Sequence, residues 1–279
     1  MSKHFFQNAT LRLVLLKTYR AYARSMVWRQ GPKVFINSIP KAGTHLATAI
    51  IEEVPGLMQS RLHIDMWDVH SGKERLAPIA DFKADVARFK RLLSEVRAGQ
   101  IATGHLPWNP EIAAALRDMN FKVVFITRSP KDIVNSNLHY IKGLKRIYIH
   151  ERLMREYATD EERRDAIEKG IPPRFPGDPC LDSIADIFKA YDGWANEESS
   201  EKLVLAFEDL VGMRGGGSQE KRIDSIKKIV AHVGLRPDPS VVEEIERASR
   251  SKRSFTFRSG KIGEGKSTSQ ASNSGAPSK

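Results

Sequence analysis

The chain contains a single cysteine, Cys180, and no long apolar run. A lone cysteine excludes an internal disulfide and is typical of a reducing compartment. The longest apolar candidate, residues 11–16, is interrupted by Arg12 and is too short to cross a bilayer. No small-residue cleavage site follows it, so we expect no signal peptide. These absences predict a cytoplasmic protein without a membrane-spanning segment.

Acidic residues are missing from the first 33 residues, which carry several Lys and Arg. The formal net charge of +11 favours anionic partners. No basic helix suited to reading bases is recognisable, so we expect no nucleic-acid partner. Residues 8–29 have the pattern of a basic amphipathic helix. Two interpretations of this helix stay open: it packs on the domain, or it attaches peripherally to an anionic membrane at the cytoplasmic face.

Short apolar runs alternate with helical patterns through the rest of the chain, and no internal repeat is present. The runs predicted as strands are residues 34–37, 101–103, 122–127 and 203–207. The main helices are predicted over residues 44–53, 81–98, 110–119, 182–196, 218–233 and 240–248, with another beginning at Pro130. This alternation predicts an α/β protein with a central parallel sheet flanked by helices. We expect one domain over residues 31–266, preceded by the N-terminal helix (residues 1–30) and followed by a disordered tail (residues 267–279).

A loop with the sequence SIPKAGT, residues 38–44, follows the first predicted strand and opens a helix. A helix N-terminus offers unpaired N–H groups and a positive dipole end. Gly43 lets the backbone approach an anion, while Lys41 adds a charge and Thr44 a hydroxyl. The loop lacks the Gly-Lys-Ser/Thr order of a Walker A loop, which argues against an ATP or GTP hydrolase. We predict an anion site here, with a tight structural turn as the alternative.

Two further segments leave predicted strands at their carboxyl ends, where ligands bind in parallel sheets. Arg128 follows the third strand, and Ser136 lies eight residues on (136 − 128 = 8) in the helix begun by Pro130. An arginine fork and a hydroxyl can clamp one phosphate, although an ion pair with Asp132 would also explain the arginine. His105 follows the second strand, where it could serve as a general base or have a structural role.

In this order along the chain, the segments resemble the PAPS-dependent sulfotransferases, where PAPS is 3′-phosphoadenosine-5′-phosphosulfate. The family's loop PKSGTT stands here as PKAGTH (residues 40–45), and its RNPKD segment with a following serine stands as RSPKD with Ser136. Its KTHLP-like stretch is here TGHLP (residues 103–107), and its acidic turn YEDL is FEDL (residues 207–210). Its late loop RKGxxGDWK is RSGKIGEGK (residues 258–266).

The resemblance implies a P-loop NTPase-like sulfotransferase fold, with PAPS as co-substrate and adenosine 3′,5′-bisphosphate as product. It implies that His105 is the general base and that Lys41 stabilises the leaving phosphate. The implied residues around the 5′-phosphosulfate are Lys41, Ala42, Gly43, Thr44 and His45. Those implied around the 3′-phosphate and the adenosine are Arg128, Ser136, Phe207, Arg258, Ser259 and Gly260. No metal is expected, because the sequence offers no credible metal-binding constellation.

The acceptor is predicted only by class: a hydroxyl or amine on a small molecule, a sugar or a lipid. The side chains predicted to line its cleft are His63, Trp67, Trp108 and Tyr140, with core packing as the alternative. A second functional hypothesis is a non-catalytic protein of the same fold that binds adenosine bisphosphate or acts as a scaffold. A P-loop kinase is disfavoured by the missing Walker A pattern.

Overall fold

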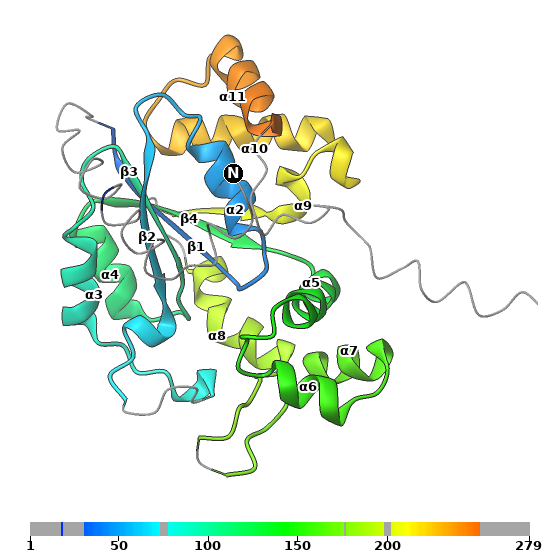
Figure 1. Cartoon of the computed structure of the whole chain (residues 1–279). Helices are drawn as coiled ribbons and strands as arrows, with labels where there is room; N and C mark the ends of the chain where they lie inside the picture. The colour runs from blue at the N-terminus through cyan, green and yellow to red at the C-terminus, as the bar shows by residue number, and fades with distance from the viewer. Residues whose placement is uncertain (1–17, 19–30, 73–77, 176, 198–201, 252–279) are drawn as a thin grey trace, which may run out of the picture.

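The computed structural model describes residue 18 and residues 31–72, 78–175, 177–197 and 202–251 (Figure 1). Apart from residue 18, the amphipathic helix predicted over residues 8–29 lies outside the described residues, as does the tail predicted beyond residue 266. Among the helices that are described, none combines the length and the apolar composition needed to cross a membrane.

In the part of the chain that the structure describes, five parallel strands form one sheet in the order β2-β3-β1-β4-β5, which confirms the predicted parallel sheet. Their bounds are β1 Lys33–Ser38, β2 Met58–Asp65, β3 Gln100–His105, β4 Phe121–Thr127 and β5 Lys202–Ala206. β1 lies in the middle, because Asn37 is level with Gly104 of β3 and with Phe125 of β4. The carboxyl ends of β3, β1 and β4 consequently meet at one edge of the sheet, which is where the three predicted sites begin.

Helices cover both faces of the sheet, with α2, α10 and α11 on one side and α3, α4 and α8 on the other (Figure 1). The helix bounds are α2 Thr44–Ile51, α3 Val86–Leu93, α4 Pro110–Asp118, α5 Pro130–Gly143, α6 His150–Glu156, α7 Asp160–Lys169, α8 Ile184–Asn196, α9 Phe207–Leu210, α10 Gln219–His232 and α11 Pro239–Ser251. The central strands are covered on both faces, which is why Val34, Phe35 and Ile36 form a continuous run at 0% exposure.

The helix predicted over residues 81–98 is wrong at both ends, since α3 spans only Val86–Leu93. Asp85 caps α3 by accepting a hydrogen bond from the Arg88 N–H. The residues before it are held away from a helix: the Ser71 N–H donates to the carbonyl of Lys83, and Ala84 bridges to His70. A capping side chain and pairing to a distant segment therefore override the amphipathic pattern.

Strand β2 was not predicted from the sequence. Its side chains alternate between buried and more exposed positions, and this period of two was the available signal. The pairing of β2 with β3 shifts register between Gln59 and His63, and Arg61 has a φ of 61° within this bulge. The bulge breaks the regular pairing. After it, residues 63–65 pair again with β3, so that Asp65, the last residue of β2, lies level with His105.

A buried asparagine fastens the end of β1 to the chain that leaves β3. The Asn37 side chain, at 0% exposure, donates to the Leu106 carbonyl at 2.9 Å and accepts from the Leu106 N–H at 2.9 Å. The Trp194 indole N–H donates to the same carbonyl at 2.8 Å. These bonds satisfy the backbone of Leu106 away from water and set the position of its neighbour His105.

We predict that Asn37→Ala lowers the free energy of unfolding by about 2–4 kcal/mol, because two hydrogen bonds are lost and the buried Leu106 N–H is left without its acceptor. Urea denaturation measures the change. The matched control is Asn196→Ala, which removes an exposed hydrogen bond to Asp192 on α8 and is expected to cost less than about 1 kcal/mol. Equal effects of the two substitutions would contradict a structural role for Asn37.

Candidate active site

The loop between β1 and α2 turns through two residues with positive φ. Lys41 has a φ of 70° and Gly43 a φ of 107°, and the Ala42 N–H donates to the Ile39 carbonyl at 3.0 Å. Glycine adopts this conformation readily, whereas for lysine it is strained. The strained residue is the lysine that was predicted to stabilise the leaving phosphate.

The helices that begin at the two predicted anion positions have no side-chain cap. Helix α2 starts after Gly43 and α5 after Ser129, and in neither does a side chain accept a hydrogen bond from the first turn. The short helices α6 and α9 also lack such a cap, whereas α3, α4, α7, α8 and α10 each have one. The Leu46 and Asp132 N–H groups bond back to the carbonyls of Gly43 and Ser129, and the N–H groups before them meet no capping side chain, as expected at an anion site.

Phe207 joins the two predicted anion positions. A Cβ placed on Gly43 would lie 2.4 Å from Cδ2 of Phe207, so the ring rests against the glycine backbone. The Arg128 guanidinium lies 4.1 Å from the centre of the same ring, and its Nη1 donates to the Lys41 carbonyl at 3.3 Å. The arginine is therefore held by the loop and by the aromatic ring together.

The Lys41 ammonium lies over the face of Tyr140, 3.6 Å from the ring centre. Burial, followed by the neighbouring positive charge of Arg128, lowers the pKa of Lys41 to about 8. Lys41 and Arg128 thus concentrate positive charge at the start of α2, where the helix dipole adds to it.

His105 is oriented by the last residue of β1. Its Nδ1 lies 2.9 Å from the carbonyl oxygen of Ser38, which can only accept, so Nδ1 carries the proton. In the neutral ring Nε2 is then the unprotonated nitrogen and can accept a proton. The hydroxyl of Ser38 lies 3.2 Å from Nδ1 and 2.6 Å from the hydroxyl of Thr44, so hydrogen bonds connect the histidine to the anion loop.

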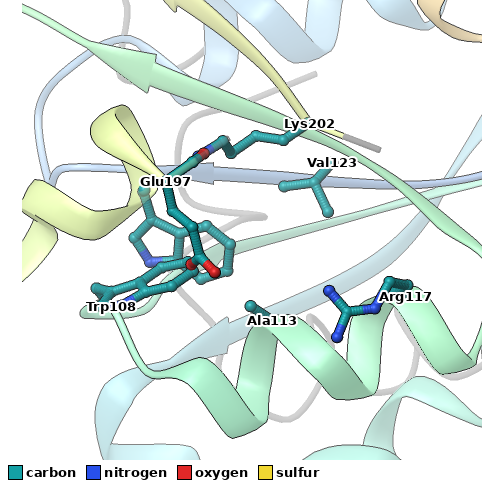
Figure 2. A pocket seen from close by; sticks show the side chains of 7 residues that line it. Trp108, Ala113, Arg117, Val123, Glu197 and Lys202 are labelled. Atoms are coloured by element: carbon teal, nitrogen blue, oxygen red, sulfur yellow. The ribbon is translucent and has the colours of Figure 1, made fainter. Parts of the chain in front are cut away.

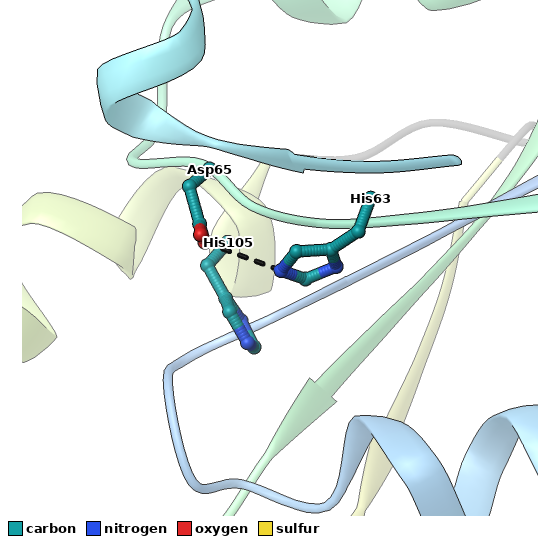
Figure 3. Close-up of side chains that lie close together, drawn as sticks. All are labelled: His63, Asp65 and His105. Atoms are coloured by element: carbon teal, nitrogen blue, oxygen red, sulfur yellow. Dashed lines mark hydrogen bonds and ion pairs between the residues drawn. The ribbon is translucent and has the colours of Figure 1, made fainter. Parts of the chain in front are cut away.

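His63 and Asp65, at the end of β2, lie beside His105 (Figure 3). The two imidazole rings are edge to face at 4.9 Å, and His63 Nε2 is 3.2 Å from the Asp65 carboxylate. Burial and the charge of His63 lower the pKa of His105 to about 4, although Asp65 and the Ser38 carbonyl act in the opposite direction. His105 is therefore neutral at physiological pH.

These three side chains have nitrogen and oxygen atoms within 4.8 Å of one another, a spacing that a metal site also requires. Hydrogen bonds within the protein account for the cluster. His63 Nδ1 is 2.8 Å from the Thr103 hydroxyl, and His63 Nε2 is 3.2 Å from the Asp65 carboxylate. His105 Nδ1 is 2.9 Å from the Ser38 carbonyl oxygen. No metal is needed to explain the arrangement.

The other residues predicted for the cofactor and acceptor sites lie on several separate elements. Ser136 is partly buried on α5, one turn before Tyr140, and His45 is exposed in the first turn of α2. Trp67 follows β2 in the short 3₁₀ helix η2 (Met66–Asp68), and its ring is 6.0 Å from that of His70. The predicted late-loop residues lie outside the described residues: Arg258, Ser259 and Gly260.

Trp108 packs against α8, edge to face with Trp194 at 4.8 Å. It lines a pocket with Val123 and Lys202, which pair with each other near the amino ends of β4 and β5 (Figure 2). The structure therefore does not bring the ring of Trp108 into the cluster at the carboxyl ends of the strands. Its assignment to the acceptor cleft stays a prediction.

Asp65 was not predicted from the sequence, and Glu208 was matched only as part of the acidic turn FEDL, without a contact or a role. Asp65 could have been found by recognising the alternation of β2, which places it level with His105. Glu208 accepts a hydrogen bond from the Ser129 N–H at 2.8 Å and so ties the turn after β5 to the start of α5. No local pattern indicates this last contact, because it joins two segments 79 residues apart.

Strand ends, two uncapped helix N-termini and two clustered cations define an α/β protein with an anion-binding corner at the carboxyl ends of a parallel sheet. The chain belongs to the sulfotransferase domain family, whose model matches residues 31–249. This confirms the resemblance drawn from the motifs and identifies the chain as a sulfotransferase. No curated protein matches it.

Solved structures of similar fold include mouse sulfotransferase SULT7A1 complexed with PAP, with 19% identity and a TM-score of 0.52 over 83% of this chain and 76% of that one. Retinol dehydratase in a complex with retinol and PAP has 17% identity and a TM-score of 0.43, over 84% of this chain and 68% of that one. At 19% identity, the likeness to SULT7A1 shows the fold alone.

We predict that Gly43→Ala destabilises the protein more than Gly56→Ala. Both glycines have positive φ, 107° and 84°, so each substitution costs about 1–2 kcal/mol of backbone strain. Only at Gly43 would the new Cβ meet Phe207, whereas nothing lies within 4 Å at Gly56. This contact should add about 1–3 kcal/mol, measured as the difference between the two variants in urea denaturation. Indistinguishable variants would show that Phe207 gives way freely.

Proposed function

We propose that the chain transfers the sulfuryl group of PAPS to a hydroxyl or amine of a small-molecule, sugar or lipid acceptor. The observation that carries this proposal is the convergence of Lys41, Arg128 and neutral His105 at the carboxyl ends of three neighbouring strands. Two cations serve an anionic donor, and an imidazole with an open Nε2 serves an acceptor that must lose a proton.

The residues present fit a donor with phosphate at two positions. The N–H groups at the start of α2, together with Lys41, suit the 5′-phosphosulfate, since no side chain caps that helix. Arg128 and Ser136, at the uncapped start of α5 and in its second turn, suit the 3′-phosphate. The similar structure of mouse sulfotransferase SULT7A1 holds PAP, which agrees with this assignment.

The chemistry asks for positioning and for charge stabilisation. The acceptor oxygen or nitrogen forms a bond to sulfur, and its proton passes to Nε2 of His105. The bond from sulfur to the bridging oxygen of PAPS breaks, and the electron pair stays on the departing 5′-phosphate of adenosine 3′,5′-bisphosphate. Lys41 stabilises the negative charge that develops there, and the positively charged corner needs no metal for this step.

His63 and Asp65 mark the acceptor side of the site in this proposal. They lie next to His105 on the edge strand β2, and the His63 side chain is 42% exposed. Polar, partly exposed groups at this position suit an acceptor that brings a hydroxyl or an amine to His105. Tyr140 and Trp67 are assigned to the same cleft.

Incubation with ³⁵S-labelled PAPS and a panel of phenols, alcohols, sugars and lipids tests the proposed function. We expect label in at least one acceptor, and binding of adenosine 3′,5′-bisphosphate in calorimetry. Binding without turnover across the panel would favour the non-catalytic nucleotide-binding protein. Absence of both would overturn the proposal.

We predict that Lys41→Met lowers kcat by several orders of magnitude, because the leaving phosphate loses a buried positive charge. Initial rates with saturating PAPS measure the effect, and circular dichroism checks the fold. The control is Lys142→Met on α5, an exposed lysine paired with Asp160. Its rate should stay within about two-fold of the wild type, since surface ion pairs contribute little. A Lys41 variant as fast as this control would contradict the assigned role.

The pH profile of kcat/KM should be a plateau between about 4 and about 8. His105 must be neutral to accept a proton, so activity is lost as the pH falls through the His105 pKa of about 4. Lys41 must be charged, so activity also falls as the pH rises through its pKa of about 8. His105→Ala should lower the plateau by about 10²–10⁴-fold. A limb near pH 6.5 in the wild type would contradict a His105 that is neutral at that pH.

A further inference from the structure

Lys41 is held at two points by the unit formed of β4 and α5. Arg128, at the end of β4, donates to its backbone carbonyl, and Tyr140, on α5, lies under its ammonium. Among the described residues no carboxylate pairs with this ammonium, and the charge that acts on it most strongly is the like charge of Arg128. The face of an aromatic ring is thus the group that stabilises the Lys41 charge while no anion is bound.

The helix explains why the ring lies at this position. Tyr140 follows Ser136 by four residues (140 − 136 = 4), so both side chains lie on one face of α5, a single turn apart. That face carries the serine assigned to the 3′-phosphate and the ring under the lysine assigned to the 5′-phosphosulfate. Helix α5 therefore carries one side chain at each of the two proposed phosphate positions.

We propose that Tyr140 is the positioning residue for Lys41, whose ammonium its ring face holds at the mouth of the anion loop before the donor binds. The ring covers one side of the ammonium and leaves the N–H groups on the other side for the donor. The role in the reaction rests on the proposed sulfuryl transfer, whereas the ring–ammonium contact itself does not. Tyr140 thereby gains a function besides the acceptor lining predicted from the sequence.

The hydroxyl of Tyr140 has no part in this role, because the attraction comes from the π face of the ring. Tyr140→Phe should therefore preserve it, and Tyr140→Leu should abolish it while keeping an apolar side chain. The matched control is Tyr157→Leu, which removes a partly buried tyrosine at the end of α6. A merely structural role for Tyr140 would make all three variants differ only in stability.

Titration of Lys41 by NMR tests the contact without any substrate. In protein with ¹³C-labelled lysine, the Lys41 Cε–Hε signal is assigned by its loss in Lys41→Arg. We expect an upfield ring-current shift in the wild type and in Tyr140→Phe, but not in Tyr140→Leu. The titrating groups that act on this signal are Lys41 itself and His45 on α2, beside the permanent charge of Arg128.

The midpoint of the titration should lie near 8 in the wild type, as the burial of Lys41 implies. Loss of a cation–π contact disfavours the charged form by roughly two- to thirty-fold, so the midpoint in Tyr140→Leu should fall by about 0.4–1.5 pH units. Tyr140→Phe and Tyr157→Leu should match the wild type. An unchanged or higher midpoint in Tyr140→Leu would overturn the proposal. So would a wild-type signal without the upfield shift, a result that needs no variant to fold.

Kinetics then test the consequence for the reaction. Tyr140→Leu should lower kcat/KM for PAPS by roughly two- to thirty-fold and move the basic limb of its pH profile downward, whereas Tyr140→Phe should keep the basic limb of the wild type. Equal losses in both variants, with no movement of the limb, would reject positioning. A wild-type protein that shows the NMR contact but no turnover would refute the proposed function and leave the contact established.

Discussion

The proximity of two like charges, Lys41 and Arg128, is the constraint on which the site depends. Each cation would be costly to bury alone, and each lies against an aromatic face, Tyr140 for the lysine and Phe207 for the arginine. The hydrogen bond from Arg128 to the Lys41 carbonyl ties the two together. Since the two helices that start here are also uncapped, positive potential accumulates at one edge of the sheet. Such a corner is suited to an anion with more than one charged group.

The same geometry gives Lys41 and His105 different charge states. Burial shifts the pKa values of both Lys41 and His105 downward, but the shifts leave the lysine charged and the histidine neutral at physiological pH. The tautomer of His105 is set by a backbone carbonyl of β1, and the strand that carries this carbonyl also leads into the anion loop. His105 of β3 and the anion loop are consequently both tied to the end of β1.

Motifs at strand ends were sufficient to predict the sheet, the family and the residues that gather at its edge. Val34 to Asn37 and the run ending at Thr127 are buried on both faces, so their apolar character was readable without the structure. The sequence could not reveal contacts between distant segments. Phe207 was matched to an aromatic position of the family, yet its packing between Gly43 and Arg128 follows only from the adjacency of β4 and β5. The capping side chain of Asp85 makes α3 begin later than the amphipathic pattern predicts. The bulge at Arg61 interrupts β2, which was not predicted.

The bulge of β2 also governs how the sheet meets other molecules. An edge strand with regular hydrogen-bonding groups is a template for adding a further strand, and such pairing leads to aggregation. In β2 the register shift and the left-handed backbone of Arg61 interrupt that template, while exposed Arg61 and His63 place polar side chains along it. The irregularity thus hinders the sheet from growing through this edge.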